Sequence, residues 1–177
     1  MLRIPNSRHN SRPRNVSDGK QSDGSSWLLL LLGLLLLGGG GVAAYYTVRG
    51  LRNNNPGNIK YNPANQWQGQ TGQDADGFVI FDTMVNGIRA LAETLRNYGR
   101  QGYNTVQAII SRWSTTDQAA YIANVAAALQ VSPSDTLDMT DADTITNLTN
   151  AIITQENGFN PLSAATIQAG VSEGMNA

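Results

Sequence analysis

The chain has 177 residues and a formal net charge of −1, a size that suits one ordinary domain and a charge that does not favour a specific nucleic-acid partner. Hydrophobic residues make up 41% and charged residues 14% of it, which is not the composition of a wholly disordered chain. It has no cysteine and one histidine, His9 in a polar N-terminal stretch, so disulfides, zinc sites, cysteine nucleophiles and a Ser-His-Asp triad are excluded from the globular part, and no metal or cofactor is expected.

Residues 1–26 are polar and rich in serine, asparagine, arginine and glycine. They carry five Lys/Arg and two Asp, a net charge of +3, and we interpret them as a disordered basic tail. The alternative is an electrostatic arm that contacts anionic lipid headgroups or packaged nucleic acid.

An uncharged, leucine-rich segment follows at residues 27–48. Its 22 residues would extend about 33 Å as a helix, enough to cross a hydrocarbon core of about 30 Å. Trp27 at one end and Tyr45 and Tyr46 at the other are typical of membrane interfaces. A buried core helix and a cleaved signal peptide are the alternatives, but leucine on every face suits lipid and no clear cleavage motif follows. The segment therefore predicts a single transmembrane helix.

The globular part is expected at residues 49–170, with a flexible tail at 171–177. Residues 52–87 are rich in Asn, Gly, Gln and Asp around short apolar bursts, which predicts loops around a small β hairpin. The sequence then changes to apolar residues at helical spacing, which predicts four helices. Their apolar faces are Ile88–Leu91–Ala92–Leu95, Val106–Ile109–Ile110–Trp113, Ile122–Val125–Ala126–Leu129 and Ile145–Leu148–Ile152.

Thr140 and Asp143 are candidate N-caps for the fourth helix, and Gly158 is its expected end. The predicted fold class is therefore α+β, mainly α, in one domain that follows a single N-terminal transmembrane helix.

Glutamates are the candidates for acid–base chemistry, since cysteine is absent and histidine is confined to the tail. The globular part contains three of them. Glu93 has Arg89 four residues before it and Arg96 three after it, a pattern typical of a solvated helix face. Glu173 falls in the expected flexible tail. Glu156 is therefore the main candidate.

Glu156 lies four residues after Ile152 and continues the apolar face of its helix, so we expect it to point toward the interior. It also lies in the last helical turn, where the helix dipole disfavours negative charge. Both effects favour a protonated carboxyl that can act as a general acid. The alternative is a glutamate that only bonds backbone groups near the end of the helix.

Two segments carry a resemblance to a known family. Residues 151–161, AIITQENGFNP, resemble the segment around the catalytic glutamate of lytic transglycosylases and glucosaminidases in the lysozyme-like superfamily. Residues 54–91, which begin NNPGNIK, resemble the segment that follows this glutamate in glucosaminidases. Because their order is reversed here, the chain resembles a circular permutation of that fold over roughly residues 50–170. Phage virion proteins that open with RNNNPGNI and end with a Glu-Asn-Gly segment are similar throughout.

The resemblance implies catalysis by one residue, Glu156, and substrate binding by five others: Asn58, Tyr61, Trp67, Tyr121 and Asn157. For Trp67, ordinary core packing is an equally open alternative. Gln155 stands where these proteins often carry histidine, which weakens any role for a neighbouring base and leaves the acid in place.

The chemistry implied by this resemblance is glycan cleavage by a proton-donating glutamate. A transglycosylase needs no second carboxylate, because the muramoyl C6 hydroxyl attacks and closes an anhydro ring. Hydrolysis needs a partner carboxylate, and Asp76 and Asp82 are the candidates.

Together these features predict a membrane-anchored, virion-associated phage enzyme that cleaves peptidoglycan of the host cell wall during infection. Its expected partners are peptidoglycan glycan strands, a lipid membrane and other virion or capsid proteins. Its expected location is the internal membrane of a phage virion, and the host inner membrane before assembly. The alternatives are a catalytically inactive virion membrane protein that uses the domain for binding, and a bacterial or prophage wall-remodelling protein.

The predicted membrane span has a direct test. The full-length protein is expected to stay with bacterial membranes during alkaline carbonate extraction, because its uncharged segment is long enough to span the bilayer. Immunoblotting of pellet and supernatant measures the partition, and release into the supernatant would contradict a spanning anchor.

Overall fold

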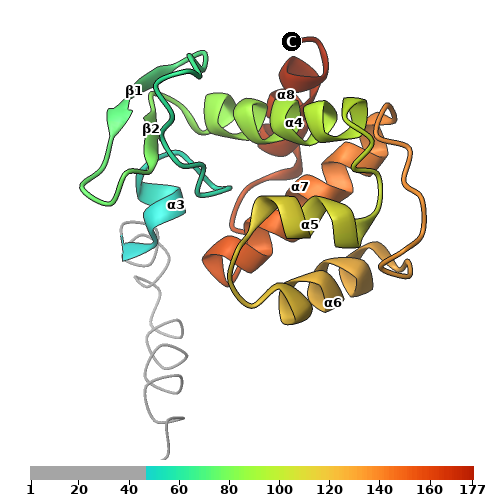
Figure 1. Ribbon diagram of the computed structural model, residues 1–177. Helices are drawn as coiled ribbons and strands as arrows, with labels where there is room; N and C mark the ends of the chain where they lie inside the picture. The colour runs from blue at the N-terminus through green and yellow to red at the C-terminus, as the bar shows by residue number, and fades with distance from the viewer. Residues whose placement is uncertain (1–46) are drawn as a thin grey trace, which may run out of the picture. The chain divides into compact units, whose positions relative to one another are not determined.

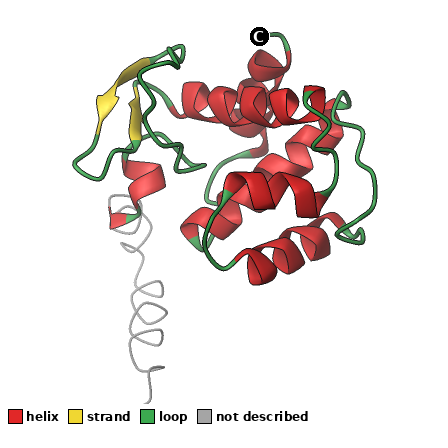
Figure 2. Cartoon of the chain, in the orientation of Figure 1, coloured by secondary structure: helices red, strands yellow, loops and turns green. Residues whose placement is uncertain are grey.

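The computed structural model describes residues 47–177, which belong to one compact unit (Figures 1 and 2). The predicted tail at 1–26 and all of the predicted span except Thr47 and Val48 lie outside these residues. Within 47–177, no helix combines the length and apolarity that crossing a bilayer requires. The elements are α3 (Arg49–Arg52), β1 (Gln70–Gln73), β2 (Val79–Phe81), α4 (Met84–Arg100), α5 (Val106–Trp113), α6 (Gln118–Leu129), α7 (Ala142–Asn157) and α8 (Ala164–Met175). The mainly helical α+β class is confirmed.

Strands β1 and β2 form the expected small antiparallel hairpin, with an irregularity between Gln70 and Gly72. The preceding loop runs along β2: the backbone N–H of Val79 donates to the carbonyl of Ile59 at 2.9 Å, and Lys60 forms a bridge with Phe78. The loop at residues 58–61 is thus held in register against the sheet.

An asparagine-rich turn ties this loop to the hairpin. The side chain of Asn55 is 1% exposed, and its amide nitrogen donates to the carbonyls of Ile59 and Val79, at 2.9 Å each. The Asn54 amide reaches the carbonyl of Phe81 at 3.1 Å, and Asn53 bonds Asp74. The amides of the NNN run therefore supply hydrogen bonds to backbone carbonyls that the two strands do not bond to each other.

The main core lies among helices α4 to α8. The predicted faces of α4, α5 and α7 are confirmed as the buried faces, except for Trp113 in α5, which is only partly buried. In α6, Val125 and Ala126 are buried as predicted, but the face shifts at its start, where Tyr121 is buried at 5% exposure and Ile122 is only half-buried. This shift matters because it turns the phenol of Tyr121 inward.

The start of α7 differs from the prediction. Asp141 is the N-cap and accepts the backbone N–H of Thr144 at 2.8 Å, in place of Thr140 or Asp143. Thr140 lies one residue before the cap, and its N–H and hydroxyl donate to Asp138 in the preceding turn. The predicted end is confirmed, because Gly158 adopts the left-handed conformation (φ 77°) that suits glycine after a helix.

Residues 171–177 were expected to form a flexible tail, but most of them belong to helix α8. It continues to Met175, and Val171 is 2% exposed. Figure 1 shows it packed along α4, where Gly170 approaches Ile88 so closely that there is no room for a side chain. Small residues allow this close packing, and their weak apolar pattern is why the sequence did not reveal the helix. Glu173 is therefore an exposed residue of α8.

Replacing Gly170 by leucine is expected to lower the free energy of unfolding by about 2 kcal/mol or more, because any Cβ there overlaps Ile88. The matched control is Ala169→Leu, on the exposed side of the same helix, with an expected change within about 0.5 kcal/mol. Urea unfolding followed by circular dichroism measures both. Equal stabilities would contradict the packing of α8 on α4.

Candidate active site

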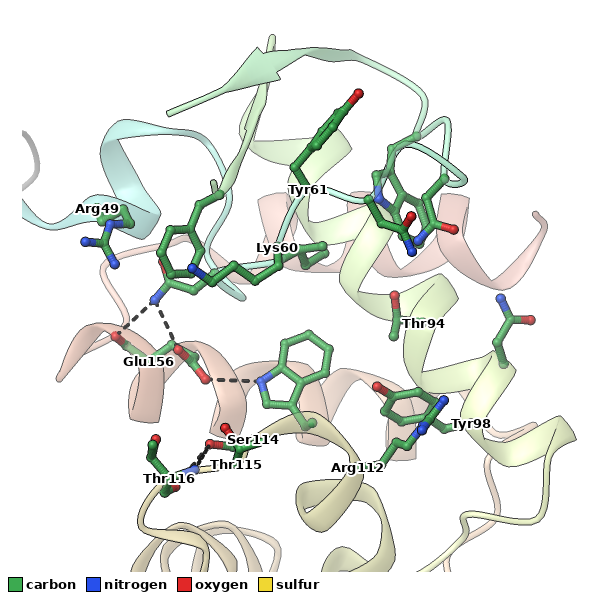
Figure 3. A pocket seen from close by; sticks show the side chains of 18 of the residues that line it. Arg49, Lys60, Tyr61, Thr94, Tyr98, Arg112, Ser114, Thr115, Thr116 and Glu156 are labelled. Carbon is green, nitrogen blue, oxygen red and sulfur yellow. Dashed lines mark hydrogen bonds between the residues drawn. The ribbon is translucent and has the colours of Figure 1, made fainter. Parts of the chain in front are cut away.

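A cavity of about 950 Å³ lies between the loop before the hairpin, one side of α4, the end of α5 and the end of α7 (Figure 3). Aromatic rings, amides and hydroxyls make up most of its wall. Its lining residues are Arg49, Asn58, Ile59, Lys60, Tyr61, Asn62, Pro63, Asn65, Trp67, Phe78, Thr94, Asn97, Tyr98, Arg112, Trp113, Ser114, Thr115, Thr116 and Glu156.

Glu156 projects into this wall from the last turn of α7, half-buried rather than inside the core. Its Oε1 accepts hydrogen bonds from Trp113 Nε1 at 3.1 Å and from the Tyr121 hydroxyl at 2.9 Å. Its Oε2 accepts one from Asn58 Nδ2 at 3.1 Å. The end of α5, the start of α6 and the loop before the hairpin thus each supply one donor to the carboxylate.

The two donors to Oε1 hold it firmly. The indole of Trp113 can only donate. Burial, and next the negative charge of Glu156, raise the pKa of Tyr121 well above its ordinary value, so its phenol keeps its proton and also donates. Oε1 is therefore the anchored oxygen of the pair.

Asn58 contacts the other oxygen from a left-handed backbone conformation (φ 50°), which asparagine tolerates better than most residues. Its own N–H donates to the carbonyl of Asn55 at 2.9 Å, which fixes the turn. Its side-chain Oδ1 is buried and has no hydrogen-bond partner among the described residues. Asn58 thus presents one donor to Glu156 and keeps one acceptor unused.

Some of the predicted binding residues line the cavity and others do not. Tyr61 and Trp67 line the cavity, and Trp67 also packs against the hairpin core, as the core-packing alternative expects. Tyr121 contacts the cavity only through Glu156. Asn157, also expected to bind substrate, is buried and does not line the cavity.

Asn157 instead connects α7 to the asparagine-rich turn. Its amide nitrogen donates to the carbonyl of Pro56 at 2.7 Å and to that of Ile153 at 2.8 Å. It follows Glu156 directly on the helix, and because successive residues are rotated by about 100° their side chains point in different directions. Asn157 therefore fixes the position of the residues that flank Asn58 rather than facing the cavity.

Glu156 is the only carboxylate among the described residues that line the cavity. Asp76 is exposed and forms an ion pair with Arg49 Nη2 at 2.6 Å. Asp82 accepts the Asn86 amide at 2.7 Å, a hydrogen bond that lowers the pKa of Asp82. Neither candidate partner for hydrolysis lines the cavity, and no cluster of three acidic side chains suited to a metal occurs within 47–177.

Several lining residues had no role in the sequence-based site. Trp113 counted only as part of an apolar face, and its donor nitrogen gave no separate signal. The tertiary fold brings Arg112 of α5 and Thr94 and Tyr98 of α4 to one cavity, and local sequence does not encode this arrangement.

Comparison with known proteins shows where the chain belongs. No protein-family model matches it. It is 37% identical to protein P5 of Pseudoalteromonas phage PM2 over 134 residues, which cover 72% of this chain and 82% of that protein. The chain belongs to the family of this phage protein.

Removing the phenol of Tyr121 tests the geometry around Glu156. Tyr121→Phe is expected to lower the free energy of unfolding by about 1–2 kcal/mol, because it deletes a hydrogen bond to a charged group. Tyr103→Phe is the control, with an expected change within about 0.5 kcal/mol, since its ring pairs with Tyr98 and no hydrogen bond of its hydroxyl is found within 47–177.

A double-mutant cycle then isolates the contact. In the Glu156→Gln background, Tyr121→Phe is expected to cost about 1 kcal/mol less than in the wild type. Equal costs in both backgrounds would show that the phenol and the carboxylate do not interact.

Proposed function

We propose that this chain cleaves the glycan strands of peptidoglycan, with Glu156 as general acid and then base. The observation that carries the proposal is a single glutamate in the wall of a cavity of about 950 Å³, with one oxygen anchored by Trp113 and Tyr121. General acid catalysis requires a positioned carboxyl that can reach the reacting oxygen.

The cavity wall suits a carbohydrate. Tyr61, Trp67 and Tyr98 present aromatic surface, while Thr94 and Asn97 present hydroxyl and amide groups from the same side of α4. The Trp67 Nε1 is buried without a hydrogen-bond partner among the described residues, so it is a donor available to a ligand. Sites for sugars combine flat apolar faces with a few polar groups that fix orientation.

In the proposed reaction, Oε2 of Glu156 gives its proton to the glycosidic oxygen as the bond from that oxygen to the muramoyl C1 breaks. The muramoyl C6 oxygen then bonds to C1, and its proton passes to Oε2, which closes an anhydro ring and restores the acid. Throughout, Trp113 and Tyr121 hold Oε1.

The side chain of Asn58 can form a hydrogen bond with Oε2 whether or not Oε2 carries a proton. Its amide nitrogen donates to the ionised oxygen at 3.1 Å. A rotation of the amide by half a turn would present the unpartnered Oδ1 as an acceptor for the protonated oxygen. Asn58 therefore suits both states of an acid that becomes a base.

The absence of a second lining carboxylate within 47–177 supports ring closure over hydrolysis. Hydrolytic enzymes place two carboxyl groups about 5–9.5 Å apart across the scissile bond. Asp76 and Asp82, each bound to another side chain, do not take that position.

Membership in the family of protein P5 of phage PM2 supports a phage protein. Together with the apolar segment at 27–48, it supports a virion protein anchored in an internal membrane and, before assembly, in the host inner membrane. There the domain would open the cell wall locally during infection, beside other virion or capsid proteins.

A second candidate is a virion membrane protein that binds peptidoglycan without cleaving it. Each oxygen of Glu156 already accepts a donated hydrogen bond, an arrangement that also suits a carboxylate that only holds a ligand. Gln155, bonded to Asn124 at 2.9 Å, supplies no base next to it.

The first test is zymography of the full-length protein on purified sacculi. Glu156→Gln is expected to reduce cleavage by about 10²- to 10⁴-fold, because the amide cannot deliver a proton. The fold should persist, since a rotated Asn58 can accept from the new amide. Glu93→Gln is the control, because Glu93 pairs with Arg89 at 3.3 Å and does not line the cavity.

Full activity of Glu156→Gln, or loss of activity in Glu93→Gln alone, would show that the site is wrong. An inactive wild type that still binds sacculi would favour the second candidate.

A further inference from the structure

The charge of the cavity wall is opposite to that of the globular part as a whole. Residues 49–177 contain seven Lys/Arg and eleven Asp/Glu, a net charge of −4. Three of these seven cations line the cavity, but only one of the eleven carboxylates does. The cavity is thus a positive region of an otherwise acidic domain, which points to an anionic ligand.

Two of the three cations are already engaged. Arg49 forms ion pairs with Asp76 at 2.6 Å and Asp74 at 3.6 Å. Lys60 donates to the carbonyl of Asp76 at 2.9 Å, and its nitrogen lies 3.6 Å from the ring centroid of Phe78. Figure 3 shows both on the side of the cavity that holds Glu156. The hairpin thus engages both groups, Arg49 through two carboxylates and Lys60 through a carbonyl and an aromatic ring.

Arg112 differs from them. It is an exposed residue of α5 on the Tyr98 side of the cavity (Figure 3), and its side chain forms neither a hydrogen bond nor an ion pair within 47–177. Its guanidinium carbon lies 5.8 Å from the ring centroid of Tyr103. Burial raises the pKa of Tyr98, and the charge of Arg112 opposes this shift. The guanidinium therefore lies near aromatic rings and has no counter-ion among residues 47–177.

We propose that Arg112 forms a subsite for a carboxylate carried by the glycan strand, so that the cavity selects acidic, muramoyl-containing strands over neutral N-acetylglucosamine polymers. This inference rests on the proposed function. A guanidinium binds a carboxylate through two parallel hydrogen bonds, which gives geometric selectivity as well as attraction. A peptidoglycan strand offers such groups either on the lactyl ether of muramic acid or on the attached peptide.

Binding to three soluble probes distinguishes these sources. The probes are chitohexaose, which is neutral; glycan strands stripped of peptide by an amidase, which expose lactyl carboxylates; and strands that retain their peptides. Titration calorimetry uses full-length Glu156→Gln protein, in which cleavage of the strands is expected to be about 10²- to 10⁴-fold slower. Arg112→Gln is added to this background and compared with Arg52→Gln, which removes an exposed charge outside the cavity.

Arg112→Gln is expected to weaken binding of at least one acidic probe roughly tenfold, the scale of one charge-assisted hydrogen bond at an exposed site. Chitohexaose binding and all binding by Arg52→Gln should be unchanged. If Arg112→Gln weakens binding of the stripped strands, the lactyl carboxylate is the ligand. If it weakens binding of the intact strands alone, the ligand is a carboxylate of the peptide.

Two results would overturn the subsite. One is unchanged binding of both acidic probes by Arg112→Gln; the other is equal weakening for the acidic probes and chitohexaose. If the wild type still cleaves sacculi in either case, only the subsite fails. If no probe binds and the wild type does not cleave sacculi, the proposed function fails with it.

Discussion

The carboxylate of Glu156 depends on donors from three separate parts of the chain. Trp113 ends α5, Tyr121 lies in the first turn of α6, and Asn58 lies in the loop before the hairpin. Their hydrogen bonds of 2.9–3.1 Å require these segments to meet within a few ångströms at the end of α7. A charged group that leaves bulk water is stable only when such partners are in place, so this constraint sets the arrangement of the elements around it.

The rest of the fold keeps these three segments in place around Glu156. The apolar faces of α4, α5 and α7 form the core and fix the direction of each helix. Asn157, directly after Glu156, bonds the carbonyl of Pro56, while Asn55 bonds this turn to β2. The residue that carries the carboxylate and the loop that carries Asn58 are thus joined twice, through Glu156 and through Asn157. Amide side chains, rather than ion pairs, make this connection.

Local patterns in the sequence were sufficient for the class of fold and the hairpin. Apolar spacing also gave α4, α5 and α7, because a helix that packs on a core repeats its apolar residues at a fixed interval. Helix α8 was not predicted, because it packs through Gly170 and other small residues that contribute little to an apolar pattern. Asp141 was not predicted as the N-cap of α7, because three polar residues close together in the sequence could each cap the helix.

The site was predictable to a smaller extent. The helical spacing after Ile152 and the Glu-Asn-Gly segment singled out Glu156, and Tyr61 and Trp67 do line the cavity with it. Asn157, predicted to bind substrate, is buried and bonds the carbonyl of Pro56 instead of lining the cavity, since adjacent helical residues point in different directions. Trp113 and Arg112 join the site through contacts between distant segments, and no short-range pattern reports such contacts.

The most direct test of the central claim is the chemical form of the cleaved ends. Purified sacculi are digested with the full-length protein, and the soluble fragments are analysed by mass spectrometry. If Glu156 acts alone in the cavity, the fragments should end in anhydro-muramic acid, one water lighter than a hydrolysis product. Fragments with ordinary reducing ends would contradict a single-carboxylate mechanism, and intact sacculi would contradict the assignment of a cleaving enzyme.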